Sequence, residues 1–114
     1  MSDELRGWIF HFDEDGFVIA ENEGYSQEIL FALSDFFDDM HDLDTVQIMM
    51  GDWKGIKAAY PENPVGLAFN ATHVYLSDVD TVTVASLYEQ FDAVTLPEIE
   101  FMQAVTDFRD FLQT

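Results

Sequence analysis

The side chains in this sequence that could do chemistry are mainly carboxylates. From His11 onward, one segment matches part of the calcium-binding EF-hand loop, with Asp13, Asp15 and Gly16 at the third, fifth and sixth loop positions. The loop would begin with this histidine and end with Asn22 in place of the bidentate glutamate, and the residues on both sides have strand character. We therefore interpret the segment as a turn and expect no metal site.

The sequence has few of the other groups that catalysis needs. It contains no cysteine, which excludes thiolate chemistry and disulfides, and its histidines lack the HExxH spacing of a metal site. No GxSxG, P-loop or GxGxxG pattern occurs, and carboxylates are so numerous that no catalytic pair can be singled out. Only four basic residues could bind an oxyanion or a phosphate: Arg6, Lys54, Lys57 and Arg109. We expect that the protein is not an enzyme and needs no cofactor.

The composition nevertheless predicts a folded protein. The formal net charge of −19 comes from 23 Asp and Glu residues against four Lys and Arg. Such an imbalance is typical of disordered chains, but 48% of the residues are hydrophobic and 11 are Phe, which supplies material for a core. A length of 114 residues suits one domain. We predict a single acidic globular domain over residues 1–114.

The charge also limits the kinds of partner. An anionic surface repels nucleic acid and anionic lipid headgroups and attracts cationic macromolecules. We expect a basic protein as the partner, no direct contact with nucleic acid, no membrane contact, and a monomer. The N-terminal segment MSDELRGW lacks the basic and apolar regions of a secretory signal. Together with the absence of cysteine, this favours a cytoplasmic location.

Hydrophobic periodicity predicts the elements that position the carboxylates. Residues 8–12 and 17–20 have the character of strands on either side of the turn at 13–16, which predicts a β-hairpin. From Ser26, a candidate N-cap, apolar residues recur at helical spacing as far as Met40. The first part of the chain is therefore expected to form a hairpin followed by a helix.

The rest of the chain is predicted to contain strands and a C-terminal helix. The predicted strands cover residues 45–50, 55–60, 65–70 and 72–76, with loops at 51–54 and 61–64. Residues 79–92 combine strand-favouring valines with a later helix-favouring segment, and we favour a helix. Thr95 to Glu98 have the pattern of a capping box before a helix that continues to the C-terminus. The expected fold is α+β, with a mostly antiparallel sheet of short strands covered by two or three helices, including a C-terminal helix.

The predicted helix after Ser26 separates apolar from acidic side chains. With about 100° per residue, its apolar residues share one side, and Glu28, Asp35, Asp38, Asp39 and Asp42 lie on the other. The four aspartates span about 10 Å, or one charge per ~3.5 Å, close to the ~3.4 Å phosphate spacing of one DNA strand. Like charges on a helix cost roughly 0.2–0.5 kcal/mol per pair. This face is either a solvated surface or a recognition surface, and we favour recognition because the charge imbalance extends over the whole chain. Replacing the aspartates by Asn is then expected to leave folding intact or to improve it.

One aromatic residue, Phe31, projects from the middle of the acidic side. A neighbouring segment could cover it, or it could be an exposed apolar anchor among charges, as in a binding hot spot. The candidate partner-binding residues are Glu28, Phe31, Asp35, Asp38, Asp39, Asp42, Asp13, Glu14 and Asp15. No catalytic or metal-binding residue is predicted.

In its length, its charge and its acidic helix segment SDFFDDMHDLD, the chain resembles the small bacterial DNA-mimic proteins, most of all those that bind the histone-like protein HU. These proteins share a layout of charge on unrelated folds and have no sequence consensus. The resemblance implies an inhibitor or regulator that binds HU on its DNA-contacting surface and competes with DNA. It carries no residue assignments to this sequence.

Two other functions fit a compact polyanion. An immunity protein that neutralises a cationic nuclease toxin uses the same electrostatics with a different target. Alternatively, the charge could be an adaptation to high salt, but halophilic surfaces usually accompany modest hydrophobic content. Because this chain is rich in Phe, we rank adaptation to high salt below DNA mimicry and toxin immunity.

Overall fold

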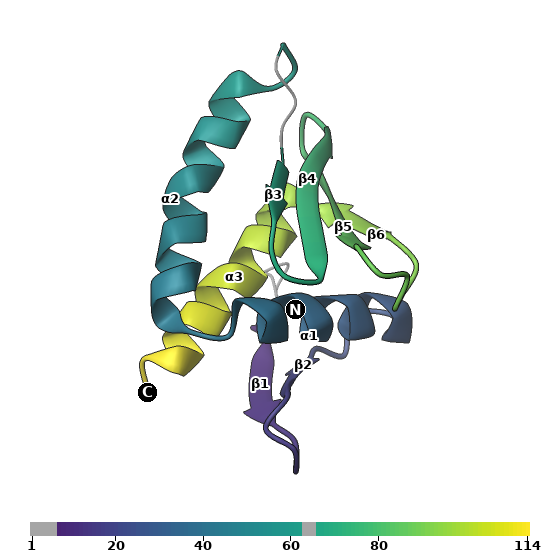
Figure 1. Ribbon diagram of the computed structural model, residues 1–114, viewed down its shortest axis with the longest axis vertical. Helices are drawn as coiled ribbons and strands as arrows, with labels where there is room; N and C mark the ends of the chain where they lie inside the picture. Colours follow the sequence, from purple (N-terminus) through teal and green to yellow (C-terminus); the bar gives the residue numbers. More distant parts are fainter. Residues whose placement is uncertain (1–6, 63–65) are drawn as a thin grey trace, which may run out of the picture.

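One helix, α1 (Gln27–Met40), lies between two antiparallel sheets (Figure 1). The computed structural model describes residues 7–62 and 66–114. The smaller sheet is a hairpin of β1 (Ile9–Phe12) and β2 (Val18–Glu21). The larger sheet has the strand order β3 (Gly66–Ala68), β4 (Thr72–Asp78), β5 (Thr81–Ser86) and β6 (Val94–Pro97).

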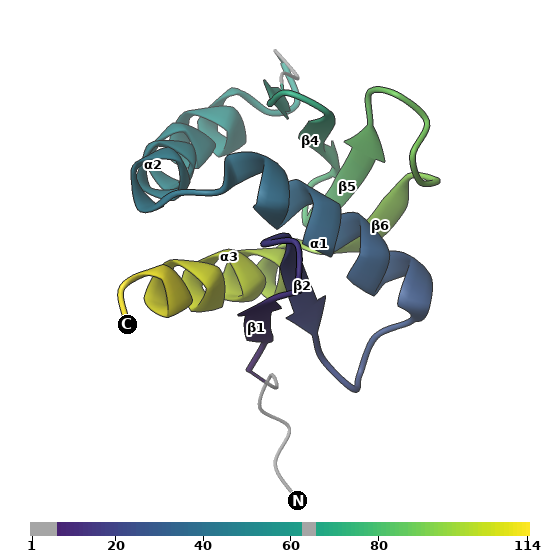
Figure 2. The same cartoon turned by 60° about the horizontal axis from the view of Figure 1, so that its bottom comes forward.

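Two further helices, α2 (Leu43–Ala59) and α3 (Glu98–Leu112), complete the α+β fold. They lie next to each other on one side of the molecule in Figure 1 and again in the turned view of Figure 2. The predicted fold class, with antiparallel sheets of short strands and a C-terminal helix, is confirmed. Within the described part of the chain, no helix combines the length and the apolar character needed to cross a bilayer.

Aromatic rings form the centre of the core. Phe36 and Phe37 of α1 are fully buried, as their place on the apolar side of the helix predicts. Phe37 packs on Phe108 of α3 with ring centroids 4.7 Å apart, and Phe36 packs on Phe101 at 5.6 Å. Each such pair adds about 0.5–1.5 kcal/mol beyond the burial of its area. The phenylalanine pair therefore anchors α1 against α3.

The predictions for the first part of the chain are confirmed. Asp13 Oδ1 accepts hydrogen bonds from the backbone N–H groups of Asp15 and Phe17, both at 2.9 Å, and closes the predicted turn. Gly16 has a φ of 85°, which glycine adopts without strain. The Ser26 hydroxyl accepts from Ile29 N and caps α1.

The prediction of two strands and a loop over residues 45–60 is wrong, because α2 covers this segment. Its buried side chains, Val46, Met49, Trp53 and Ile56, recur every three or four residues, which is helical spacing. The glycines within α2, at 51 and 55, lie on its exposed side, where each lowers helix propensity by about 1 kcal/mol relative to Ala. Packing of the apolar side against α3 outweighs this local preference.

Two later predictions are also wrong. Residues 79–92 contain β5 and a loop instead of a helix, because β5 pairs with β4 on one side and β6 on the other. The predicted capping box at Thr95 does not form, because Thr95 belongs to β6 and pairs with Thr83 of β5. Helix α3 starts after Pro97 without a side-chain cap. The predicted strands at 65–70 and 72–76 correspond to β3 and β4, while Val65 and the loop positions 63–64 lie outside the described residues.

A carboxylate at the start of α3 joins this helix to α2. Glu98 Oε2 accepts a hydrogen bond from Trp53 Nε1 at 2.9 Å, and Oε1 pairs with Lys57 Nζ at 2.7 Å. Because Trp53 is buried, its indole N–H depends on this acceptor.

Replacing Glu98 by Ala should lower the free energy of unfolding by roughly 2 kcal/mol, since a buried donor loses its acceptor. Lys57→Ala is the matched control, because it removes only the partly exposed ion pair and should cost less than about 1 kcal/mol. Urea unfolding followed by tryptophan fluorescence measures both. If both variants lose the same free energy of unfolding, the hydrogen bond from the Trp53 indole to Glu98 does not contribute to stability.

Candidate partner-binding site

Two polar side chains of α1 hold the edge of β2 that does not pair with β1. Val18 N donates to Asp38 Oδ1 at 3.0 Å, and Ala20 N donates to Ser34 Oγ at 2.9 Å. The Ser34 hydroxyl in turn donates to Leu30 O at 2.7 Å. Edge N–H groups would otherwise need a third strand or water. Asp38 is thus a structural acceptor as well as a charge.

The next aspartate along α1 serves the larger sheet. Asp39 Oδ2 accepts from Ala71 N at 2.9 Å, from Thr72 N at 3.0 Å and from Thr72 Oγ1 at 2.7 Å. Thr72 is fully buried at the start of β4. One carboxylate oxygen therefore satisfies three donors at the bend between β3 and β4.

Asp42 has a third structural role, as the N-cap of α2. Its Oδ1 accepts from Thr45 N at 2.8 Å. This backbone hydrogen bond holds the pKa of Asp42 below its usual range. The prediction placed these aspartates on the outer face of one helix. Asp38 and Asp39 are instead partly buried and accept backbone hydrogen bonds, while Asp42 is exposed but lies beyond the end of α1, where it caps α2. The expectation that their replacement leaves folding intact is revised with it.

Asp35 has a different environment from the other three. It is half-buried, and its pKa is raised first by burial and then by the charges of Asp38 and Asp39. Among the described residues, none donates a hydrogen bond to its carboxylate. Of the four aspartates in the predicted row, Asp35 is the one whose charge works against folding.

The other predicted residues lie mostly in solvent. Glu14 and Asp15 are exposed at the tip of the hairpin, and Glu28 is exposed in the first turn of α1. The Phe31 side chain is 53% exposed, with its ring edge-on to Phe91 at 6.1 Å. Phe31 is thus only partly covered, and the second alternative, an exposed apolar residue among charges, describes it better.

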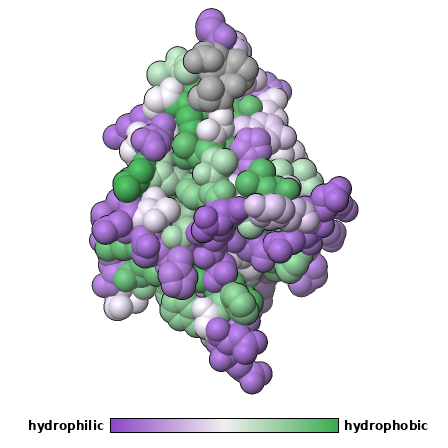
Figure 3. Space-filling view, viewed as in Figure 1, coloured by the Kyte–Doolittle hydropathy of each residue, from purple (hydrophilic) through white to green (hydrophobic). Residues whose placement is uncertain are grey.

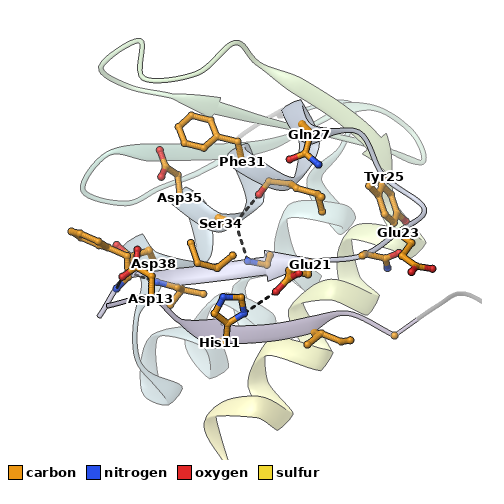
Figure 4. A pocket seen from close by; sticks show the side chains of 18 residues that line it. His11, Asp13, Glu21, Glu23, Tyr25, Gln27, Phe31, Ser34, Asp35 and Asp38 are labelled. Carbon is orange, nitrogen blue, oxygen red and sulfur yellow. Dashed lines mark hydrogen bonds and ion pairs between the residues drawn. The ribbon is translucent and has the colours of Figure 1, made fainter. Parts of the chain in front are cut away.

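A groove of about 1310 Å³ runs between α1 and the outer side of the hairpin. Of the predicted residues, it brings together Asp13, Phe31, Asp35 and Asp38 (Figure 4). Glu14 and Glu28 directly follow the lining residues Asp13 and Gln27, and Asp15 lies in the same hairpin turn, between Asp13 and Phe17. Asp39 and Asp42 are not part of the groove.

The groove residues that were not predicted include four outward-facing residues of the hairpin strands: Ile9, His11, Ile19 and Glu21. Their alternation with the buried Phe10 and Ala20 was the signal that could have revealed them, because successive side chains of a strand point to opposite sides. Figure 3 shows hydrophilic surface along α1 and at the hairpin tip, with hydrophobic surface between them.

The groove has a negative electrostatic character. The only basic side chain among its lining residues is His11, whose Nδ1 lies 2.9 Å from Glu21 Oε2. At one end of the groove, the Tyr25 hydroxyl donates to Glu100 of α3, and burial raises the pKa of this phenol, so it stays protonated. Within residues 7–62 and 66–114, no three His, Asp or Glu side chains are grouped to hold a metal ion. The carboxylates of the lining can attract cations and hydrogen-bond donors.

Replacing Asp39 by Ala should lower the free energy of unfolding by roughly 3 kcal/mol, because the donors at the bend lose a charged acceptor. Asp39→Asn retains an acceptor oxygen and should lose clearly less. Urea unfolding followed by circular dichroism measures both variants. If Asp39→Ala is as stable as the parent protein, the hydrogen bonds to Ala71 and Thr72 do not contribute.

Asp35→Asn should instead raise the free energy of unfolding at neutral pH by roughly 0.5 kcal/mol, since it relieves two like-charge contacts. A carboxyl whose folded-state pKa is raised binds its proton more tightly when folded, so its charged form destabilises the protein above that pKa. The advantage of the variant should therefore shrink as the pH falls through the raised pKa and be lost below the ordinary value of 3.8. Thermal unfolding at several pH values measures this difference. Lower stability of Asp35→Asn at neutral pH would contradict it.

The site thus combines structural acceptors, exposed carboxylates and a partly apolar groove on one side of the molecule. Comparison of the chain with known protein families, with curated protein sequences and with solved structures finds no match.

Proposed function

We propose that this protein binds a basic DNA-binding protein of the HU type and competes with DNA for it. The observation that supports this most is the segregation of charge along the chain. From residue 7 to residue 53, which includes the hairpin, α1 and most of α2, there is no Lys or Arg. The described cations lie on α2 and α3, at Lys54, Lys57 and Arg109, and the last two take part in ion pairs.

The exposed carboxylates around the groove are available to a partner. Glu14, Asp15 and Glu28 are exposed, and Asp35 is half-buried with a charge that the fold disfavours. A cation that approaches Asp35 would relieve this unfavourable charge. The structural aspartates Asp38, Asp39 and Asp42 add to the field but already accept hydrogen bonds. The proposed contact surface is therefore centred on the hairpin tip and on the exposed side of α1, and not on an unbroken row along the helix.

Competition with DNA follows from the chemistry of the partner. A protein that binds duplex DNA presents Lys and Arg to the phosphates, and these side chains attract any dense anionic surface. An anionic protein seated on them excludes DNA from the same area. Long-range attraction also speeds the encounter and weakens as salt screens the charges.

The test is displacement of fluorescent duplex DNA from purified HU by this protein. Displacement should be efficient at low salt and fall steeply at moderate salt. The double variant Glu14→Gln/Asp15→Asn should weaken binding to HU roughly tenfold and lessen its salt dependence. The matched control is Asp44→Asn/Asp52→Asn, which removes the same charge from exposed positions on α2 and should have a smaller effect.

Absence of any complex with HU at low salt would overturn the proposal for this partner. A tight complex with a cationic nuclease, together with rescue of cells that express the nuclease, would identify an immunity protein instead. Equal effects of the two double variants would mean that only the net charge matters and that the hairpin side is not the contact surface.

A further inference from the structure

The groove between α1 and the hairpin exposes more apolar surface than a purely electrostatic contact needs. Three large apolar side chains line it with high exposure: Ile9 at 67%, Phe17 at 54% and Phe31 at 53%. Single exposed apolar residues are common on protein surfaces, but several gathered in one concavity are typical of binding sites.

The walls of the groove are held in place without a partner. The hydrogen bonds from Val18 N to Asp38 and from Ala20 N to Ser34 tie the hairpin to α1 along its length. In Figure 4, Phe31 and Asp35 project from the helix on one side, and His11 and Glu21 lie on the hairpin on the other. A site that is formed beforehand loses less conformational entropy on binding.

The charge of the lining selects the kind of occupant. Carboxylates of Asp13, Glu21, Asp35 and Asp38 lie among the apolar residues, and no Lys or Arg lines the groove. An apolar segment without charge would partly desolvate these carboxylates and bring no cation to offset the loss of water, which costs free energy. A purely cationic segment would leave the exposed phenylalanine and isoleucine side chains in water.

We infer that the groove binds an extended segment of the partner in which Lys or Arg side chains alternate with large apolar ones. This inference rests on the proposed function and adds the part of the partner that is recognised. Cationic side chains would pair with the carboxylates at the rim, and apolar side chains would pack between Ile9, Ile19 and Phe31. The electrostatic share of binding is then sensitive to salt, and the apolar share is not.

The probes are two synthetic peptides of equal length and charge, one with alternating Lys and Leu and one with alternating Lys and Gly. Fluorescence anisotropy at moderate salt should show that the Lys/Leu peptide binds at least about tenfold more tightly. Ile9→Ser and Phe31→Ser should each remove most of this difference. Ile48→Ser is the matched control, because Ile48 is 64% exposed on α2 and lies outside the groove, and it should leave the difference unchanged.

Equal affinity for the two peptides, or an unchanged preference in the Ile9 and Phe31 variants, would overturn the inference. A second copy of the chain is another possible occupant of the groove, and sedimentation of the free protein tests it. Dimers of the parent protein that are lost in the Ile9→Ser variant would show that the groove binds a second copy and would overturn the inference. Failure of the proposed function is recognised separately, by DNA displacement from HU. If displacement persists while the peptide preference is absent, only the groove inference fails.

Discussion

The fold depends on how α1 satisfies backbone N–H groups of two sheets that do not pair with each other. Ser34 and Asp38 accept from the edge of β2, and Asp39 accepts from the bend between β3 and β4. An edge that lacks such acceptors leaves polar groups unpaired wherever water is excluded. A single helix therefore acts as the hydrogen-bonding neighbour of both sheets, while its opposite side supplies the phenylalanines of the core.

This arrangement explains how a helix with so much like charge is tolerated. Repulsion between the aspartates opposes the helix, but the backbone hydrogen bonds that their carboxylates accept stabilise the packed structure and offset part of that cost. The carboxylates thus fall into two groups. Asp38, Asp39 and Asp42 belong to the architecture, whereas Glu14, Asp15 and Glu28 have no comparable structural contact in the described part of the chain and give the hairpin side its negative field.

Sequence reasoning was most successful where structure is decided locally. The turn at Asp13, the cap at Ser26 and the apolar spacing of α1 are each readable within a few residues. It failed for α2, whose glycines and β-branched residues favour other structures until packing against α3 is considered. It also failed for β5, whose pairing with two neighbouring strands involves residues outside the local window.

The same distinction applies to the candidate site. The sequence correctly placed Phe31 and Asp35 on the side of α1 away from the core, and the structure finds both in the groove. It could not reveal the structural roles of Asp38 and Asp39, because their hydrogen bonds join residues 20 to 33 positions apart in the chain. The alternation of residues along the hairpin separates its two sides, and the contacts of Phe10 with Phe37 and Phe108 decide which side is turned inward.

The pairing of Ser34 with Ala20 and of Asp38 with Val18 has a further consequence for the hairpin. Residues four apart on a helix rise by about 6 Å, and residues two apart on a strand by about 6.7 Å, so the two repeats nearly coincide. A slip of β2 by one residue would move both donors out of reach and exchange the inner and outer sides of the strand. Two four-residue strands are too short to specify their own register. The spacing of the two acceptors on α1 therefore fixes the register of β2.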